Sequence, residues 1–310
     1  MTTKSKKKII LLVSNSLNNP DLISGDDMLV QSLIEIGYDV DIVAFSIFYD
    51  LINKFKSTDA DLVFNLFQNT SDDISTQMHI VGVLEILGIP YIGHNPFVLG
   101  LSNMKNFVKR LLESKRIPSI PYQIYREKPK STHLDFPVIL RPTDMDWPSA
   151  RLHEKKILNF KTLKEEVTNY LDKYRRPILV ESFVPGRIFL VGLFGNEKAQ
   201  ILPVCEAVMS GITYQYKCPA ALDWEQSYHL RDIALHVYHY LMGKDYALVS
   251  FMIDDENEIY VADYHPNPSL LAGSIFQLGF KVSDYEFTDF LQIIINETLK
   301  KESDDKNKKI

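Results

Sequence analysis

Short apolar segments alternate with helix-like segments over the first hundred residues. The apolar or β-rich segments are 9–13, 39–44, 61–65 and 91–93. Between them, 27–36 and 76–87 carry apolar residues three and four positions apart, which predicts two amphipathic helices. Gly37 and Gly88 follow these helices, where a glycine commonly ends a helix. Strands that alternate with helices are typical of a parallel sheet, so we expect residues 1–98 to form an open α/β lobe.

Beyond residue 98 the pattern becomes a mixture of helices, loops and short strands. A helix is predicted over 101–115. Further strands are predicted at 137–142, 178–183, 189–194, 199–204, 247–253 and 258–264, and further helices at 163–174 and 228–241. No low-complexity linker separates these segments, so we expect 99–186 and 187–302 to form two α+β lobes that pack against the first. Residues 303–310 are expected to be a frayed tail.

The composition limits the class of protein without identifying it. Hydrophobic residues make up 45% and charged residues 24% of the chain, which is ordinary for a globular protein. The chain has no apolar run long enough to predict a membrane span, and the run at 9–13 is too short for a secretory signal. A net charge of −6 argues against a nucleic-acid binder. Cys205 and Cys218 are too few for a disulfide framework, which favours a cytoplasmic location.

Six motif-like segments follow one another along the chain. They are the stretch from 61 to the Gly-Ile-Pro-Tyr-Ile-Gly sequence at 88–93, Leu101–Lys105, Ile139–Pro142, Leu179–Arg187, Cys218–Ala220 and Tyr260–Ser269. In this order they resemble the D-alanine–D-alanine ligase family of the ATP-grasp superfamily, and the resemblance runs from about residue 8 to residue 297. Each segment alone is a weak signal, whereas six segments in one order are specific.

The resemblance implies an ATP-grasp fold, in which a Rossmann-like pre-ATP-grasp lobe precedes two α+β lobes that clasp a nucleotide. It also implies an ATP-dependent carboxylate–amine ligase that acts through an acyl phosphate, with ATP and Mg²⁺ as cofactors. The partners would be small-molecule carboxylate and amine substrates, such as an amino acid or a peptide, and a homodimer is one option. Neither nucleic acid nor a membrane is expected as a partner.

The resemblance also implies a set of nucleotide-binding residues. Lys105 and Arg141 are expected to bind the phosphates of ATP, because a polyphosphate requires fixed cations and an arginine can grip it bidentately. Glu181 is expected to accept the amino group of adenine. Phe183 and Val184 are expected to line the adenine pocket.

Metal ligands and catalytic residues are implied at four positions. Asp263 and His265 stand where the family carries its E-x-N metal ligands, although a histidine nitrogen is a poor partner for Mg²⁺, which prefers oxygen. The catalytic candidates are Arg141 and Ser274, and the Ser274 hydroxyl is expected to bind a substrate carboxylate.

Several positions depart from the family pattern. Leu248 stands in place of an arginine that stabilises an oxyanion, and Ser250 replaces an aspartate that binds metal. Ile188 replaces a glutamate that binds ribose, and the loop 144–150 over the phosphates contains no glycine. Synthesis of D-alanyl-D-alanine is therefore not expected. Two hypotheses remain open: a ligase for other substrates, and a non-catalytic ATP-grasp protein that binds nucleotide weakly or acts as a partner or scaffold.

Overall fold

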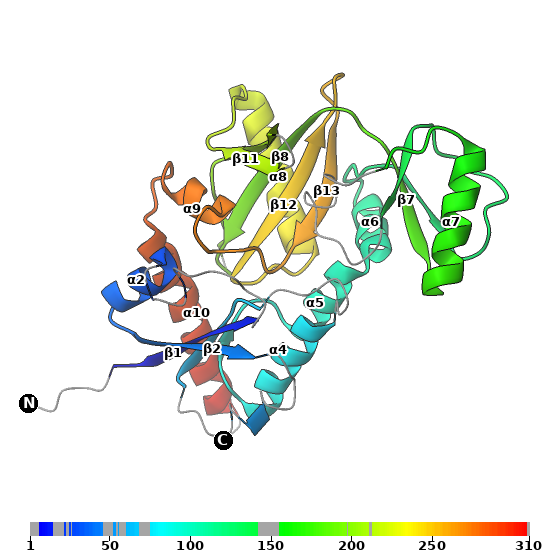
Figure 1. Cartoon of the computed structure of the whole chain (residues 1–310). Helices are drawn as coiled ribbons and strands as arrows, with labels where there is room; N and C mark the ends of the chain where they lie inside the picture. Colours follow the sequence, from blue (N-terminus) through cyan, green and yellow to red (C-terminus); the bar gives the residue numbers. More distant parts are fainter. Residues whose placement is uncertain are drawn as a thin grey trace, which may run out of the picture.

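Four parallel strands form the sheet of the first lobe in the computed structural model (Figure 1). The structure describes residues 6–14, 22, 25, 27–45, 52–53, 55, 60–67, 75–141, 155–196, 198–210 and 213–308. The strand order is β2 (Asp39–Phe45), β1 (Lys8–Ser14), β3 (Leu62–Asn65) and β4 (Tyr91–Ile92). Helix α2 (Met28–Glu35) lies between β1 and β2 in the chain, and α4 (Thr76–Leu87) lies between β3 and β4. This arrangement is the predicted α/β lobe.

The apolar run that predicted β1 is buried on both of its faces. Ile9 and Leu11 pack into one core cluster, whereas Ile10 and Leu12 pack into another. A parallel sheet covered on both sides requires such continuous apolar strands. Gly88 ends α4 with φ of 65°, the left-handed conformation in which glycine is favoured, as predicted.

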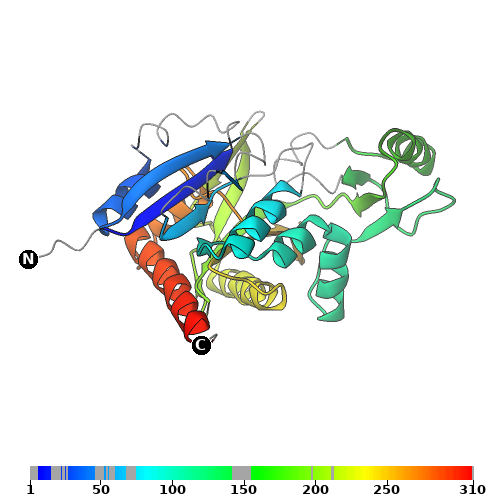
Figure 2. The same ribbon diagram turned by 90° about the horizontal axis from the view of Figure 1, so that it is seen from below.

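The last helix, α10 (Phe287–Lys308), returns to this first lobe. It packs against α2 and β4, and both views show it against the parallel sheet (Figure 1 and Figure 2). Its buried side chains share a core cluster with those of α2 and β1. Residues 303–308, which the sequence analysis assigned to a frayed tail, are helical in backbone.

The second lobe is a three-stranded antiparallel sheet covered by one helix. The strand order is β5 (Tyr122–Tyr125), β7 (Ile178–Ser182) and β6 (Val138–Arg141), and the helix is α7 (Phe160–Tyr174). Two helices, α5 (Pro96–Asn103) and α6 (Lys105–Ser114), lead into this lobe. The single helix predicted over 101–115 is thus two helices, because Met104 has a non-helical backbone with φ of −95° and ψ of 66°.

The third lobe is an antiparallel sheet whose strands differ in length, with a helix on each face. Its order is β11 (Thr213–Lys217), β10 (Cys205–Ser210), β8 (Arg187–Phe194), β12 (Tyr246–Ile253) and β13 (Ile259–His265), with β9 (Gln200–Ile201) paired to β8. Helix α8 (Trp224–Tyr240) packs on one face, and α9 (Ile275–Phe280) packs on the other. The strand expected at 199–204 is reduced to the two residues of β9.

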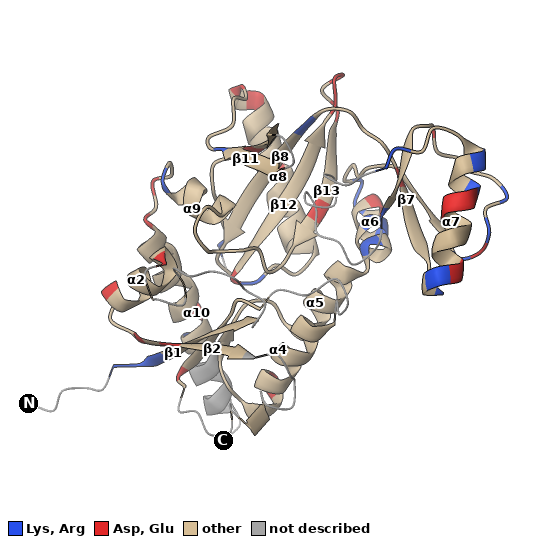
Figure 3. Ribbon diagram, in the orientation of Figure 1, with Lys and Arg blue, Asp and Glu red and all other residues tan. Residues whose placement is uncertain are grey.

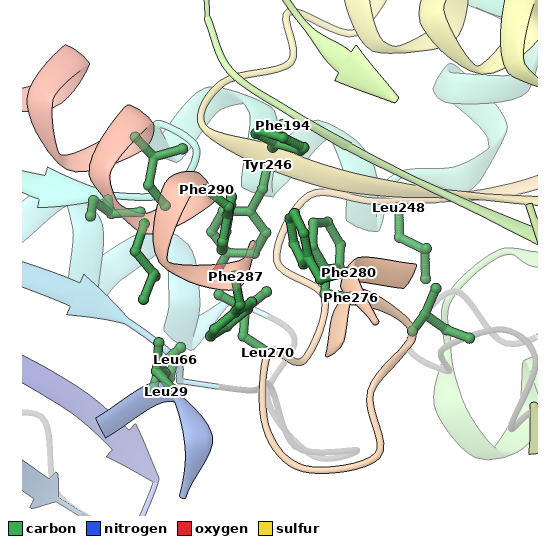
Figure 4. Packing of buried hydrophobic residues seen from close by; sticks show 14 of the residues in the cluster. Leu29, Leu66, Phe194, Tyr246, Leu248, Leu270, Phe276, Phe280, Phe287 and Phe290 are labelled. Carbon is green, nitrogen blue, oxygen red and sulfur yellow. The ribbon is translucent and has the colours of Figure 1, made fainter. Parts of the chain in front are cut away.

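Aromatic side chains fill the space between the third sheet, α9 and α10. Tyr246 of β12 meets Phe276 of α9 with ring centroids 5.6 Å apart, and Phe280 meets Phe290 of α10 at 5.2 Å. Figure 4 shows these rings together with Phe194. Such contacts add to the free energy of burying apolar area. The cluster therefore packs α10 against the third lobe as well as the first.

A buried carboxylate, Asp245, connects the first and third lobes. One of its oxygens accepts a hydrogen bond from the Gly93 backbone N–H at 2.7 Å, and the other accepts one from the Asn196 side chain at 2.9 Å. The Lys244 ammonium lies 3.2 Å from the same carboxylate, which is fully buried. Asn196 in turn donates to Glu297 of α10 at 2.9 Å. Residues distant in sequence are thus joined at one point.

His94 extends this connection as a neutral hydrogen-bond acceptor. Its Nε2 lies 2.9 Å from the Tyr264 hydroxyl and 3.1 Å from the Lys244 backbone N–H. Burial is the main cause that lowers the pKa of His94 to about 3; Asp245 and the Pro266 backbone oppose it, and Lys244 adds to it. The imidazole is therefore uncharged at neutral pH.

The two cysteines are paired. Cys205 and Cys218 form a disulfide with their Cα atoms 4.4 Å apart, at the base of the β10–β11 hairpin. Their small number was one basis for expecting a cytoplasmic location, and the disulfide removes that support. Among the helices of the described residues, none combines the length and apolar character needed to cross a membrane.

We expect Asp245→Asn to lower the free energy of unfolding by about 2–3 kcal/mol, because a buried charged acceptor is lost. Asparagine keeps the shape of the side chain and tolerates the left-handed backbone of this residue, whose φ is 60°. Urea unfolding followed by circular dichroism measures the change. Asp284→Asn alters an exposed carboxylate and serves as the control, with an expected change within about 0.5 kcal/mol. Equal urea midpoints for both variants would contradict the role of Asp245.

Candidate functional site

Helix α6 lies between the second and third sheets and presents two lysines to them. Lys105 and Lys109 are one helical turn apart, so they lie on the same side of the helix. Lys105 pairs with Asp263 of β13, and Lys109 pairs with Glu181 of β7. In Figure 3 the blue of α6 lies between β13 and the sheet of β7. The structure thereby brings together three of the residues that the sequence analysis singled out, Lys105, Glu181 and Asp263.

Glu181 is shared between two cations. The Lys109 ammonium lies 2.7 Å from one carboxylate oxygen, and the Arg141 Nε lies 3.0 Å from the other. The side chains of all three residues are no more than 5% exposed. Burial alone would raise the pKa of Glu181, but Lys109 and Arg141 outweigh it and hold the pKa below its usual value. Glu181 is therefore ionised at neutral pH, with both oxygens in contact with a cation.

Lys109 was not among the predicted site residues. It also donates a hydrogen bond to the Ile120 carbonyl at 3.0 Å, which leaves its ammonium fixed between α6 and the second sheet. Its spacing of four residues from Lys105 was the only available signal in the sequence, and that spacing does not reveal which carboxylate it meets.

Asp263 links the third sheet to α6. Its carboxylate contacts the Lys105 ammonium, and its second oxygen accepts the Tyr264 backbone N–H at 2.9 Å. Burial would raise the pKa of Asp263, but Lys105, His265 and the backbone N–H together lower it below its usual value. The carboxylate therefore keeps its charge and is compensated by the lysine.

His265 and Ser250 form a second pair on the same face of the third sheet. Nε2 of His265 lies 2.9 Å from the Ser250 hydroxyl, and Ser250 is fully buried. In the strand ladder Ser250 is opposite Asp263, and Leu248 is opposite His265. The two positions where the family pattern predicts an aspartate and an arginine thus hold a buried hydroxyl and a buried apolar side chain.

These donors do not fit a magnesium site. Mg²⁺ requires near-octahedral oxygen ligands, usually carboxylates with phosphates and water. The one carboxylate here, Asp263, contacts a lysine, and the imidazole of His265 contacts a hydroxyl. Asn267 is also engaged, since its amide oxygen accepts the Tyr246 hydroxyl at 2.8 Å and its amide nitrogen donates to the Phe67 carbonyl at 3.0 Å. Within the described part of the chain, no three His, Cys, Asp or Glu side chains are grouped to hold a metal.

The predicted adenine-pocket residues lie directly after β7. The Phe183 backbone N–H donates to the Pro137 carbonyl at 2.9 Å, and the Lys156 ammonium lies 3.8 Å from the centroid of the Phe183 ring. Val184 is partly buried against the main core cluster. Gly186 follows with φ of 149°, and a Cβ there would lie 2.1 Å from the Ile253 carbonyl. Only glycine fits this connection between the second and third lobes.

Ser274 lies apart from the charged pairs, at the start of α9. Its Oγ accepts the Gln277 backbone N–H at 3.3 Å, which caps the helix. A role in binding a substrate carboxylate therefore stays a prediction. The phosphate loop expected at 144–150 lies outside the described residues.

Comparison with solved structures identifies the class of fold. The chain is similar to a D-alanine–D-alanine ligase from Bacillus anthracis complexed with ATP, with a TM-score of 0.77 and 18% identity over 96% of this chain and 99% of that one. It is also similar to the VanG D-Ala:D-Ser ligase from Enterococcus faecalis, with a TM-score of 0.76 and 16% identity over 94% and 99% of the two chains. The protein therefore has the ATP-grasp fold, as the sequence predicted.

The family follows from the sequence. Residues 111–296 match the family model described as D-ala D-ala ligase C-terminus, so the chain belongs to this family of ATP-dependent ligases. A D-alanine–D-alanine ligase from Aquifex aeolicus is 25% identical over 307 residues, 93% of this chain and 99% of that protein. An uncharacterized protein from Sinorhizobium fredii is 26% identical over 253 residues, 76% of this chain and 74% of that protein.

We expect Lys109→Met to lower the free energy of unfolding at pH 7 by about 3 kcal/mol, because one cation is removed from a buried carboxylate. The folded-state pKa of Glu181 is lowered, so its ion pairs stabilise the protein above its usual pKa and are lost as the pH falls through the lowered value. The difference between the variant and the unmodified protein should therefore shrink in acid. Urea unfolding at several pH values measures this.

Lys164→Met removes an exposed lysine from α7 and is the matched control, with an expected effect within about 0.5 kcal/mol at every pH. A deficit for Lys109→Met that stays constant down to pH 3 would show that the lysine acts by packing alone.

Proposed function

We propose that this protein is an ATP-dependent carboxylate–amine ligase whose substrates are not two D-alanine molecules. The observation that supports it is the gathering of Lys105, Lys109 and Arg141 around two buried carboxylates where the second and third lobes meet. Fixed cations in a water-poor site are what a polyphosphate requires. We place the enzyme in the cytoplasm, where ATP and amino-acid substrates are available.

The proposed reaction has two steps. A carboxylate oxygen of one substrate attacks the γ-phosphorus of ATP, so that an acyl phosphate forms and ADP leaves. An amine of the second substrate then attacks the acyl carbon, the bond to the phosphate oxygen breaks, and inorganic phosphate and a proton are released. Lys105 and Arg141 would bind the phosphates, and Lys109 would hold Glu181 in position beside Arg141 and the adenine.

The face of the third sheet argues against D-alanine ligation. Leu248 is 8% exposed and packs in the main core cluster, so no cation stands there to stabilise a tetrahedral oxyanion. Removing one such donor typically slows a reaction by about a hundred- to a thousandfold. Ser250 likewise supplies no carboxylate. A different acyl acceptor or a different stabilising group is therefore part of the proposal.

The same positions favour a second candidate function. Leu248 is buried, and the Ser250 hydroxyl and the His265 imidazole are hydrogen-bonded to each other. Such side chains fit a protein that binds nucleotide without turning it over. The two candidates differ in one property, since only the ligase releases phosphate from ATP when a suitable carboxylate and amine are present.

We expect Lys105→Ala to weaken ATP binding about ten- to a hundredfold, because a charge-assisted phosphate contact is worth roughly 1.5–3 kcal/mol. Arg141→Ala should weaken it by a similar factor. Isothermal titration calorimetry measures both, and Lys115→Ala, an exposed lysine at the end of the same helix, is the control that should bind normally. Unchanged affinity in both test variants would refute the nucleotide site.

With D-alanine as sole amino acid, we expect no dipeptide above background, and we expect Ser250→Asp alone not to restore it. The missing cation at Leu248 and the missing carboxylate at Ser250 act on the same step, so repairing one leaves the other limiting. Phosphate release coupled to mass spectrometry of the products is the measurement. Dipeptide formed at several turnovers per second by the unmodified protein would overturn the argument.

A further inference from the structure

Each donor at the predicted metal position already has a partner within the protein. The Asp263 carboxylate contacts Lys105, the His265 imidazole contacts Ser250, and Asn267 bridges Tyr246 and Phe67. A metal ion bound here would have to displace at least one of these contacts and would lie beside an ammonium group.

The charges of the surrounding side chains also disfavour a metal ion. The cluster holds three cations, Lys105, Lys109 and Arg141, against two carboxylates, Glu181 and Asp263, which leaves one net positive charge from these five side chains. Taken together, these five side chains attract phosphate oxygens and repel a divalent cation.

We propose that the protein itself holds no divalent metal ion and that its nucleotide site binds metal-free ATP at least as well as the magnesium complex. The inference rests on the proposed nucleotide site. The pairs Lys105–Asp263 and Ser250–His265 occupy the places that a metal and its ligands would take, and the fixed lysines and arginine compensate the phosphates instead. Metal-free ATP carries more negative charge than its magnesium complex, so the net positive cluster favours it.

The first experiment compares ATP affinity by calorimetry in EDTA and in millimolar Mg²⁺, with the unmodified full chain. The expected result is a Kd in EDTA that equals or is lower than the Kd in Mg²⁺. Binding that is tenfold or more tighter in Mg²⁺ overturns the inference and leaves the proposed ligase intact. Absence of ATP binding in both media refutes the proposed function, and the inference about the metal is then decided by the second experiment.

The second experiment uses Mn²⁺ alone, without nucleotide. We expect no bound Mn²⁺ by electron paramagnetic resonance and no rise in Tm for the unmodified protein. The double variant Ser250→Asp with His265→Asn restores a carboxylate and an amide oxygen next to Asp263, and Mn²⁺ should bind it and raise its Tm. The matched control, Ser250→Ala with His265→Ala, opens the same space without oxygen ligands and should not respond.

The unmodified protein and the control Ser250→Ala with His265→Ala decide the result even if the variant Ser250→Asp with His265→Asn does not fold. One Mn²⁺ bound per chain in the unmodified protein, lost in Asp263→Asn, would show that the native residues do form a metal site. That result would overturn the inference.

Discussion

Compensation of buried charge is the constraint on which the arrangement of the three lobes depends. Glu181 and Asp263 lie on different sheets, and neither could stay ionised at its depth without a cation. The two lysines that compensate them come from one short helix, α6, on which Lys105 and Lys109 are one turn apart. Because each lysine is committed to a different sheet, the position of α6 fixes the distance between the second and third lobes. The candidate site is thus also where the second and third lobes are connected.

Hydrogen bonds around Asp245 and His94 connect the first lobe to the third. Asp245 accepts hydrogen bonds from Gly93 and Asn196, and His94 stays neutral between Tyr264 and the Lys244 backbone. Apolar packing between α10, α9 and the third sheet supports these polar contacts over a larger area. The first lobe is therefore held by one buried carboxylate within an aromatic and aliphatic contact. The second and third lobes are joined by the ion pairs of the candidate site, with apolar contacts and a hydrogen bond from the Val261 backbone N–H to the Pro118 carbonyl beside them.

Sequence patterns predicted what depends on neighbouring residues and missed what depends on distant ones. Helix α4 was predicted with the bounds observed, and Gly88 ends it with the left-handed backbone that the pattern required. The break at Met104 was missed because the apolar spacing continues through it. The partners of Lys109 and Ser250 were missed because they lie on other strands, seventy-two and fifteen positions away. Pairing of the cysteines was missed because a pair of cysteines carries no information on whether the fold brings them together.

The path of α10 has a consequence for how the chain acquires its structure during synthesis. The core beneath β1 and α2 includes Phe290 and Ile294, which a ribosome translates about 260 residues after Leu29. Until those residues emerge, one face of the first sheet lacks the cover that α10 provides beside α2, and the apolar side chains there remain open to water or to a chaperone. The first lobe to be translated is therefore the last to be completed, and a chain stopped before residue 287 would lack that cover.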